Sequence, residues 1–360
     1  MFGIGARRSA ASERRRIERL DGLSRAVITG IGVVSPVGIG HEQFWDSLCE
    51  GATGIGHISR FDSSTFPCRI AAEVRDFRPD DFMTAQQVEA YPRSTQLSYA
   101  AYLLARKDSG IDLFDPYRTD VVIGCGCSSF EFVDEQVFSN PTAGRRYVPG
   151  TFDPFGVGKY NINSPACSIA FEADARGLVT TVSTACASGL TAIGLGLERI
   201  QEDKADVVVA GATDAAVNHF TLHLFSSADF LCTVNEDPSK ALFPFDVRHT
   251  RSVLGEGSAV VVLEELEHAR ARGARIYAEV VGFNQEYENV DHFFRTDKTG
   301  GKWGTNIRSL LLKTEARVDY ISAHGTSDQM LDCLEARALE YALGPDAARK
   351  TPVGSIKGAI

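Results

Sequence analysis

The sequence predicts an α/β protein in which a sheet is buried between layers of helices. Short apolar runs rich in β-branched residues alternate along the chain with longer amphipathic segments, which is the pattern of a layered α/β architecture. Of the 360 residues, 44% are apolar and 23% are charged, as is typical of globular proteins. No apolar run reaches the roughly 18 residues that a membrane-spanning helix needs.

The expected elements begin at Arg25. The first apolar run is interrupted by Gly30, Gly32 and Pro36, so we expect a strand that soon enters a glycine-rich turn. Apolar residues at helical spacing predict three helices, at 41–51, 94–110 and 328–344. Further strands are expected at 120–126, 177–183, 205–211, 257–266, 274–284, 318–325 and from 351 onward. Residues 128–172 are dense in Gly and Pro, and we expect a long loop there, with room for short helices.

Charge and cysteine usage exclude several classes of function. The formal net charge of −10 argues against nucleic acid or an anionic membrane surface as the main partner. Residues 1–24 are rich in arginine but also contain acids, so we expect a solvated arm rather than a targeting segment. The eight cysteines are scattered, which predicts a reduced, cytoplasmic protein. Cys125 and Cys127 lack further ligands at metal-binding spacing, so we expect two small buried residues and no metal.

One stretch, "VSTACASGLTAIGLG", places a lone cysteine, Cys186, where an apolar strand gives way to a helix expected to begin at that residue. Unpaired N–H groups at a helix N-terminus favour the thiolate, which is the nucleophilic form. The small neighbouring residues leave room for a substrate to reach the sulfur. Gly194 and Gly196 weaken the helix, so something must approach it closely. A buried structural cysteine is the alternative interpretation.

A nucleophilic cysteine also needs a base or an electrophilic partner. Of the histidines, His324 is the best candidate, because it follows the apolar run "VDYIS" and precedes Gly325 in a turn. A strand end of this kind is a common position for a functional side chain.

Several motifs together resemble the β-ketoacyl synthase family. They are "STACASG", "AHGTSDQMLDCLEARAL" and "GSIKGAI", with "VVVAGATDA", "ALFPFD" and "LGEGSAVVVLEEL" in family order. The resemblance covers nearly the whole chain from Arg25. It implies a thiolase-like αβαβα fold built from two related halves, here residues 25–270 and 271–360, with the second half incomplete at the C-terminus.

The resemblance also implies roles for individual residues. Cys186 accepts an acyl chain as a thioester, and the enolate left by decarboxylation of a malonyl group on acyl carrier protein attacks it. His324 polarises the malonyl thioester carbonyl, and Lys357 supports the site electrostatically. Asp332 and Glu335 hold the histidine and lysine in place, although residues at this spacing also suit a solvated helix face. No metal or organic cofactor is implied.

The sequence departs from the family pattern at its end. In the family, a Gly-His pair with the second catalytic histidine follows the lysine, and a glycine-rich strand follows later. This chain stops at Ile360, so we expect a fragment of a longer product, with a degenerate member as the alternative. Turnover is then expected to need the missing segment.

Three further departures lie near the substrate path. Thr326 matches a threonine that contacts the pantetheine arm, but Asp328 replaces a second one. Ser252 replaces a phenylalanine that gates the cysteine in many members, and Arg251 replaces a glycine. These changes leave open whether the pathway is fatty-acid or polyketide assembly.

The leading hypothesis is a β-ketoacyl synthase that works with acyl carrier protein and pairs as a homodimer through the strand beside the nucleophile helix. The alternative is a non-catalytic partner subunit of the chain-length-factor kind, in a heterodimer with a related synthase. Cys186 argues against that alternative, because such partners commonly lose the cysteine. A thiolase-type acyltransferase acting on coenzyme A is a third interpretation, which the "AHGT" and "SIK" motifs disfavour.

Overall fold

The computed structural model describes residues 22–111, 115–127, 130, 153–288, 297 and 299–360. Most of the expected arm at 1–24 and much of the expected loop at 128–172 lie outside these residues. Within them, no helix is both long and apolar enough to cross a bilayer.

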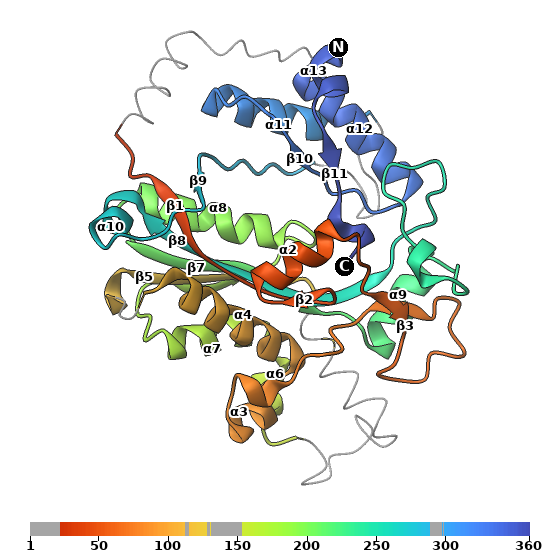
Figure 1. Cartoon of the computed structure of the whole chain (residues 1–360), viewed down its shortest axis with the longest axis horizontal. Coiled ribbons are helices and arrows are strands. Elements are labelled where there is room, and N and C mark those ends of the chain that lie inside the picture. The colour runs from red at the N-terminus through yellow and green to blue at the C-terminus, as the bar shows by residue number, and fades with distance from the viewer. Residues whose placement is uncertain (1–21, 112–114, 128–129, 131–152, 289–296, 298) are drawn as a thin grey trace, which may run out of the picture.

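The centre of the protein is a mixed sheet between two helical layers (Figure 1). Its main path runs in the order β2-β1-β8-β7-β5-β6. The strands of this path are β1 (Ala26–Ser35), β2 (Gly38–Ile39), β5 (Thr119–Gly124), β6 (Val179–Val182), β7 (Val207–Ala215) and β8 (Leu254–Glu265). The short strands β3 (Ile55–His57), β4 (Ile70–Ala72) and β9 (Ala278–Val280) join beside this path. A layered α/β architecture is therefore confirmed.

One face of the sheet is covered by α4 (Arg93–Ser109) and α7 (Ser164–Glu172). The other face is covered by α8 (Ser188–Gln201), which contacts β7 and β5. Strand β5, which lies between β7 and β6, is buried at every residue, as the apolar run at 120–126 predicts. The helix α7 shows that the end of the expected loop is a regular element packed on the sheet.

The expected break of the first strand at Gly30 and Gly32 is wrong, because β1 runs through both residues. A β-carbon on Gly32 would lie 1.9 Å from the carbonyl oxygen of Ala101, and one on Gly30 would lie 2.3 Å from that of Ala105. Both carbonyls belong to α4. The glycines therefore let the helix lie directly on the strand, and they do not form a turn.

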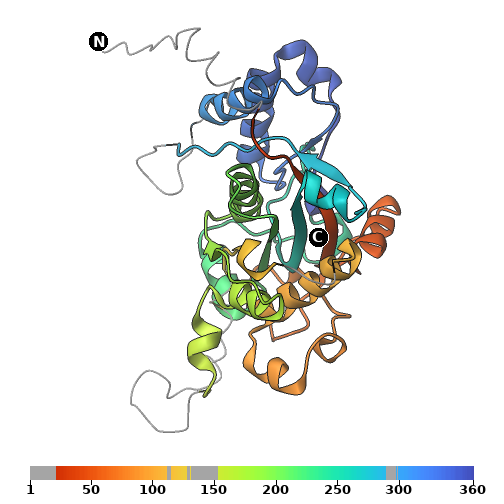
Figure 2. The same ribbon diagram turned by 90° about the vertical axis from the view of Figure 1, so that its left-hand side faces the viewer.

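The C-terminal part stacks on the α8 side of the sheet, as Figure 2 shows from a second direction. The parallel strands β10 (Ile321–Ser322) and β11 (Val353–Gly354) pair there, and α11 (Gly301–Thr314) packs against α12 (Gln329–Leu343). The strands expected at 274–284 and 318–325 are only three and two residues long. The helix at 328–344 is confirmed, with Gly344 as its C-cap.

The remaining helices lie around this core. They are α2 (His41–Cys49), α3 (Ala85–Ala90), α6 (Gly156–Tyr160), α9 (His219–Ser227), α10 (Leu266–Ala271) and α13 (Pro345–Lys350), with single 3₁₀ turns at Pro79–Asp81, Pro116–Arg118, Pro238–Lys240 and Ile356–Gly358.

Candidate active site

Cys186 lies in a tight turn between β6 and α8, and its side chain is exposed. The expectation that the helix begins at Cys186 is wrong, because α8 begins at Ser188 with Ala187 as its N-cap. Ala185 adopts a positive φ of 51°, which ends the strand direction before the helix can start. Ser188 closes the turn: its hydroxyl donates to the carbonyl of Ala185 (2.7 Å) and accepts from the N–H of Thr184 (2.9 Å).

The small residues around this turn serve packing as well as access. A β-carbon on Gly124 would lie 2.5 Å from the carbonyl carbon and oxygen of Ser188, so the end of β5 meets the first residues of α8 directly. The prediction that something approaches the glycines of α8 is confirmed, because a β-carbon on Gly194 would lie 2.2 Å from the ring of Phe283. Helix α8 is thus fixed by backbone contacts on one side and by an aromatic ring on the other.

Lys357 and His324 form a pair beside the cysteine. The Lys357 Nζ lies 3.3 Å from Nδ1 of His324 and also donates to the His324 carbonyl oxygen. Lys357 interacts electrostatically with Cys186 as well. Burial lowers the pKa of Lys357, although Glu335, Cys186 and Asp332 oppose that shift. The turn before α8 and the C-terminal residues therefore lie close enough for Cys186 and Lys357 to interact electrostatically.

His324 is a neutral imidazole at neutral pH. Burial, followed by the nearby charge of Lys357, lowers its pKa from 6.5 to about 4. An ammonium group can only donate, so Nδ1 of His324 accepts from Lys357 and the ring proton is assigned to Nε2. The ring of Trp303 meets this imidazole edge-on, with the centroids 6.3 Å apart. His324 thus has one fixed N–H donor.

Two acidic residues of α12, Asp332 and Glu335, hold the loop that carries His324. Glu335 accepts from the backbone N–H groups of His324 (2.7 Å) and Gly325 (2.8 Å). Asp332 accepts from the N–H of Thr326 (2.9 Å) and, across the site, from that of Phe245 (2.8 Å). Asp332 is only 3% exposed and Glu335 only 5%, so the interpretation as a solvated helix face is wrong.

Ser252 and Thr326 are joined, because the Ser252 hydroxyl donates to the Thr326 carbonyl (3.1 Å). Asp328 is the N-cap of α12 and accepts from the N–H of Leu331 (3.0 Å). Asp328, which replaces a threonine of the family pattern, therefore caps the N-terminus of α12. Arg251 has a φ of 128°, a conformation that favours the glycine of the family pattern.

Sequence reasoning missed Ser327 and Trp303. The buried Ser327 hydroxyl accepts from the N–H groups of Phe243 (3.0 Å) and Thr250 (3.2 Å), and so ties the 243–250 segment to the His324 loop. Nothing in the sequence marks this serine. Trp303 is one of only two tryptophans, which is the one signal that could have drawn attention to it. A cavity of about 630 Å³ opens beside Ser327 and is lined also by Arg251 and Asp328.

Of the cysteine pair after β5, Cys125 is buried but Cys127 is only partly buried, so the expectation holds for the first and is wrong for the second. Within the described residues, no group of three or more His, Cys, Asp or Glu side chains has the arrangement of a metal site.

Comparison with known proteins shows the class of protein to which this chain belongs. Residues 24–269 match the N-terminal domain of β-ketoacyl synthases and residues 277–360 match the C-terminal domain. The class is therefore that of acyltransferases of the 3-oxoacyl-carrier-protein synthase type. The chain belongs to the β-ketoacyl synthase family, as its motifs predict.

Two curated relatives show the range of the family. The chain is 40% identical over 344 residues to the tetracenomycin polyketide synthase ketoacyl synthase alpha subunit of Streptomyces glaucescens, covering 93% of this chain and 80% of the relative. It is 36% identical over 338 residues to 3-oxoacyl-[acyl-carrier-protein] synthase 2 of Coxiella burnetii (strain RSA 493 / Nine Mile phase I), covering 92% and 80%.

Two solved structures superpose on most of this chain. A type II polyketide acyl-carrier protein in complex with its ketosynthase bound to the hexaketide superposes with a TM-score of 0.84 at 27% identity, covering 94% of this chain and 82% of that one. The ishigamide ketosynthase/chain length factor superposes with a TM-score of 0.82 at 30% identity, covering 94% and 81%.

Proposed function

We propose that this protein is the catalytic synthase, with Cys186 as its acyl acceptor. The supporting observation is the arrangement of three groups. The Cys186 thiol is exposed before α8, Lys357 interacts electrostatically with it, and His324 is hydrogen-bonded to Lys357. In the first step, the Cys186 sulfur attacks the thioester of an acyl group on acyl carrier protein. The carrier thiol leaves, and the acyl chain stays on the enzyme as a thioester.

The second step is a decarboxylative condensation. A malonyl thioester loses carbon dioxide as its C–C bond breaks, and the resulting enolate attacks the acyl thioester and releases the Cys186 sulfur. We assign the Nε2–H of His324 to the malonyl carbonyl oxygen, where it stabilises the developing negative charge. A neutral donor suits this role, since it needs no proton transfer. Lys357 holds the tautomer, and Asp332 and Glu335 are positioning residues.

The thioester arm is proposed to reach the site past Ser252 and Thr326. Their neighbours in the sequence, Arg251 and Ser327, line the cavity of about 630 Å³. The arm would be the phosphopantetheine of an acyl carrier protein. The pathway is proposed to be fatty-acid or polyketide assembly, and the working form a homodimer or a heterodimer with a related synthase.

Acylation can be tested on this chain by itself. The protein is incubated with an acyl thioester of acyl carrier protein, and the acylated peptide is located by mass spectrometry. The acyl group is expected on Cys186, and C186S is expected to lose it. The C49S variant is the matched control, since Cys49 is also exposed but lies on α2, away from this cavity. Acylation spread over Cys49, Cys167 and Cys333, or none at Cys186, would favour the non-catalytic partner instead.

The role of His324 is tested separately by release of carbon dioxide from malonyl carrier protein. H324N is expected to keep acylation of Cys186 but to lower decarboxylation by about 100-fold, as for loss of one oxyanion donor. Equal loss of both activities would assign His324 a structural role.

A further inference from the structure

A second thiol, Cys127, lies beside the exposed Cys186. The strands that lead to them, β5 and β6, are parallel neighbours, and their register ends with Gly124 opposite Val182. The pairing goes one step further, because the N–H of Cys125 donates to the carbonyl of Val182 (3.0 Å). Both strands end there, and Cys127 follows β5 by three residues as Cys186 follows β6 by four.

Contacts beyond the strands keep the two segments together. A β-carbon on Gly126 would lie 3.9 Å from the carbonyl oxygen of Ala185. The carboxylate of Asp214, on neighbouring strand β7, accepts from the N–H groups of Gly126 (3.0 Å) and Cys127 (2.6 Å). The two thiols also interact electrostatically. Cys127 is therefore anchored by its backbone against the turn that holds Cys186.

The two sulfurs have different environments. Cys186 is exposed, whereas Cys127 is partly buried. Burial, and then the nearby charges of Asp214 and Cys186, raise the pKa of the Cys127 thiol to about 11. Cys127 is therefore mostly protonated at neutral pH, so it competes poorly for a thioester, and any attack by its sulfur goes through the minor thiolate form.

We propose that Cys127 is a resolving cysteine that closes a reversible disulfide with Cys186 when the nucleophile is oxidised by hydrogen peroxide. Gly126 lies against the Ala185 carbonyl, so the next residue of each segment, Cys127 and Cys186, belongs to adjoining turns, and a disulfide needs Cα atoms about 4.4–6.8 Å apart. The inference rests on the proposed function only in taking the Cys186 sulfur as reactive. The disulfide would block acylation and keep the sulfur from irreversible oxidation.

The chemistry balances with one molecule of peroxide. The Cys186 sulfur attacks a peroxide oxygen, the O–O bond breaks, and one water leaves with the thiol proton, which gives a sulfenic acid. The Cys127 sulfur then attacks the Cys186 sulfur, the S–O bond breaks, and a second water leaves with the Cys127 proton. The two cysteines are oxidised by two electrons, and the peroxide is reduced to two waters.

The test uses the full chain, treated with hydrogen peroxide and then with iodoacetamide. After digestion under acidic, non-reducing conditions, mass spectrometry is expected to find the peptides of Cys127 and Cys186 cross-linked, with a mass about 2 Da below their sum. The C127S variant cannot form this link, and C125S, which changes a buried neighbour, is expected to form it as the wild type does. Absence of the cross-link in the wild type would overturn the inference.

A second measurement tests the protective role. After peroxide and then dithiothreitol, the wild type and C125S are expected to recover most of their iodoacetamide labelling at Cys186. C127S is expected to recover at most about a tenth, with its sulfur trapped as sulfinic acid. Equal recovery in C127S and the wild type would overturn the protective role. Both measurements are independent of acyl transfer. A protein that forms the disulfide but is not acylated at Cys186 would therefore contradict the proposed function and leave the disulfide inference intact.

Discussion

At the scale of single residues, the site depends on hydrogen bonds that fix protons and backbone. Lys357 sets the tautomer of His324, and Glu335 holds the peptide groups on either side of the His324 α-carbon. Each carboxylate oxygen of Glu335 has its own N–H donor, so the loop cannot rotate without leaving a buried carboxylate unpaired. The position of the imidazole is thus decided mainly by backbone contacts rather than by its own side-chain contacts.

The lowered pKa of His324 predicts a pH dependence of stability. Because its pKa falls from 6.5 to about 4 on folding, the unfolded chain binds more protons between these values. Stability contributed by the neutral imidazole is therefore full above pH 6.5 and is lost as the pH falls toward 4. We expect the free energy of unfolding to lose on the order of 3 kcal/mol from this group across that window.

The measurement is urea unfolding from pH 4 to 7 for the wild type, H324Q and H57Q. The pH dependence should shrink in H324Q but not in H57Q, since His57 is exposed. An unchanged pH dependence in H324Q would contradict the assignment.

Arg251 carries a strained backbone, with a φ of 128°. Such conformations cost roughly 1–3 kcal/mol in residues other than glycine. The ion pair of Arg251 with Asp229 lies at the surface and contributes little in return. We expect R251G to be about 1 kcal/mol more stable than R251A, which loses the same ion pair but keeps the β-carbon. Thermal unfolding of the two variants checks this, and equal midpoints would show that the backbone is relaxed.

At the scale of elements, α8 is shaped by what packs against it. Its two interior glycines weaken the isolated helix, yet the ring of Phe283 occupies the space beside Gly194. The helix that follows Cys186 is therefore held by tertiary contact more than by its own propensity.

This packing predicts that the effect of G194A on the free energy of unfolding changes sign when the Phe283 ring is removed. In the wild type, G194A should destabilise the protein by about 1–2 kcal/mol, because a β-carbon would overlap the Phe283 ring. In an F283A background, the same substitution should be stabilising, since only the gain in helix propensity remains. Chemical denaturation of the four proteins measures both values. G158A is the control, because Gly158 lies in a helix with open space around it, and destabilisation by G194A in both backgrounds would contradict the explanation.

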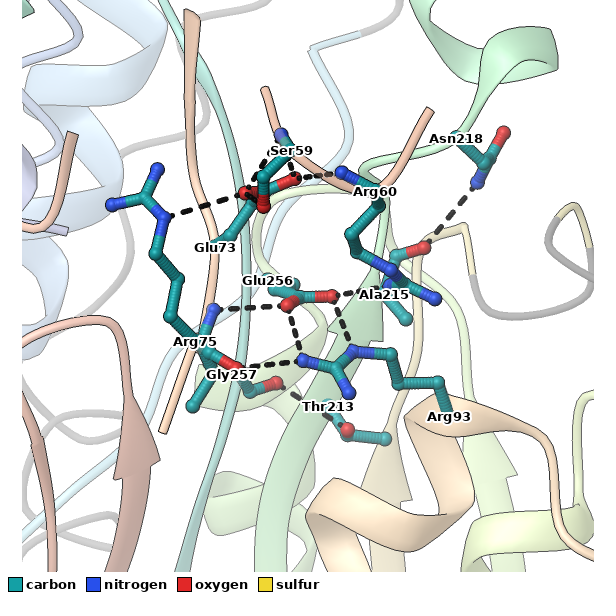
Figure 3. A network of polar contacts seen from close by, with 11 residues as sticks. Ser59, Arg60, Glu73, Arg75, Arg93, Thr213, Ala215, Asn218, Glu256 and Gly257 are labelled. Carbon is teal, nitrogen blue, oxygen red and sulfur yellow. Dashed lines mark hydrogen bonds and ion pairs between the residues drawn. The ribbon is translucent and has the colours of Figure 1, made fainter. Parts of the chain in front are cut away.

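At the scale of the whole molecule, a buried ion cluster joins distant segments (Figure 3). Glu256 on β8 accepts from Arg93 at the start of α4 (2.6 and 2.8 Å), from Arg60 (2.9 Å) and from the N–H of Val74 (2.9 Å). Burial alone would raise the pKa of Glu256, but the two arginines and the Val74 N–H lower it overall. The cluster thereby fastens the segment of β3 and β4 to the central sheet.

Removing the charge of Glu256 should therefore be costly. E256Q leaves two guanidinium groups facing a neutral partner in a buried site, and we expect a loss of about 3–5 kcal/mol in the free energy of unfolding. The comparison is E279Q, which breaks an exposed pair with Arg25 and should cost less than about 1 kcal/mol. Similar small losses in both variants would mean that water reaches the Glu256 cluster.

Local patterns predicted much of this molecule. Helical periodicity located α4 and α12, and the uninterrupted apolar run located β5, because each pattern reflects burial of a face or of a whole strand. The three-residue spacing of Asp332 and Glu335 placed both on one helix face. Periodicity failed where tertiary contact outweighs local preference, as at Gly30 and Gly32, which lie within a strand because α4 lies on them.

By itself, the sequence determined the fold class, the family and the residue types at the site, since these depend on patterning and on motifs that are contiguous in the chain. Only the tertiary structure decided that Lys357 meets His324, that Glu335 and Asp332 bond backbone rather than solvent, and that the segment of Cys127 lies against that of Cys186. Contacts between residues so far apart in the chain exist only once the sheet has brought their strands and loops together, and no local pattern records them.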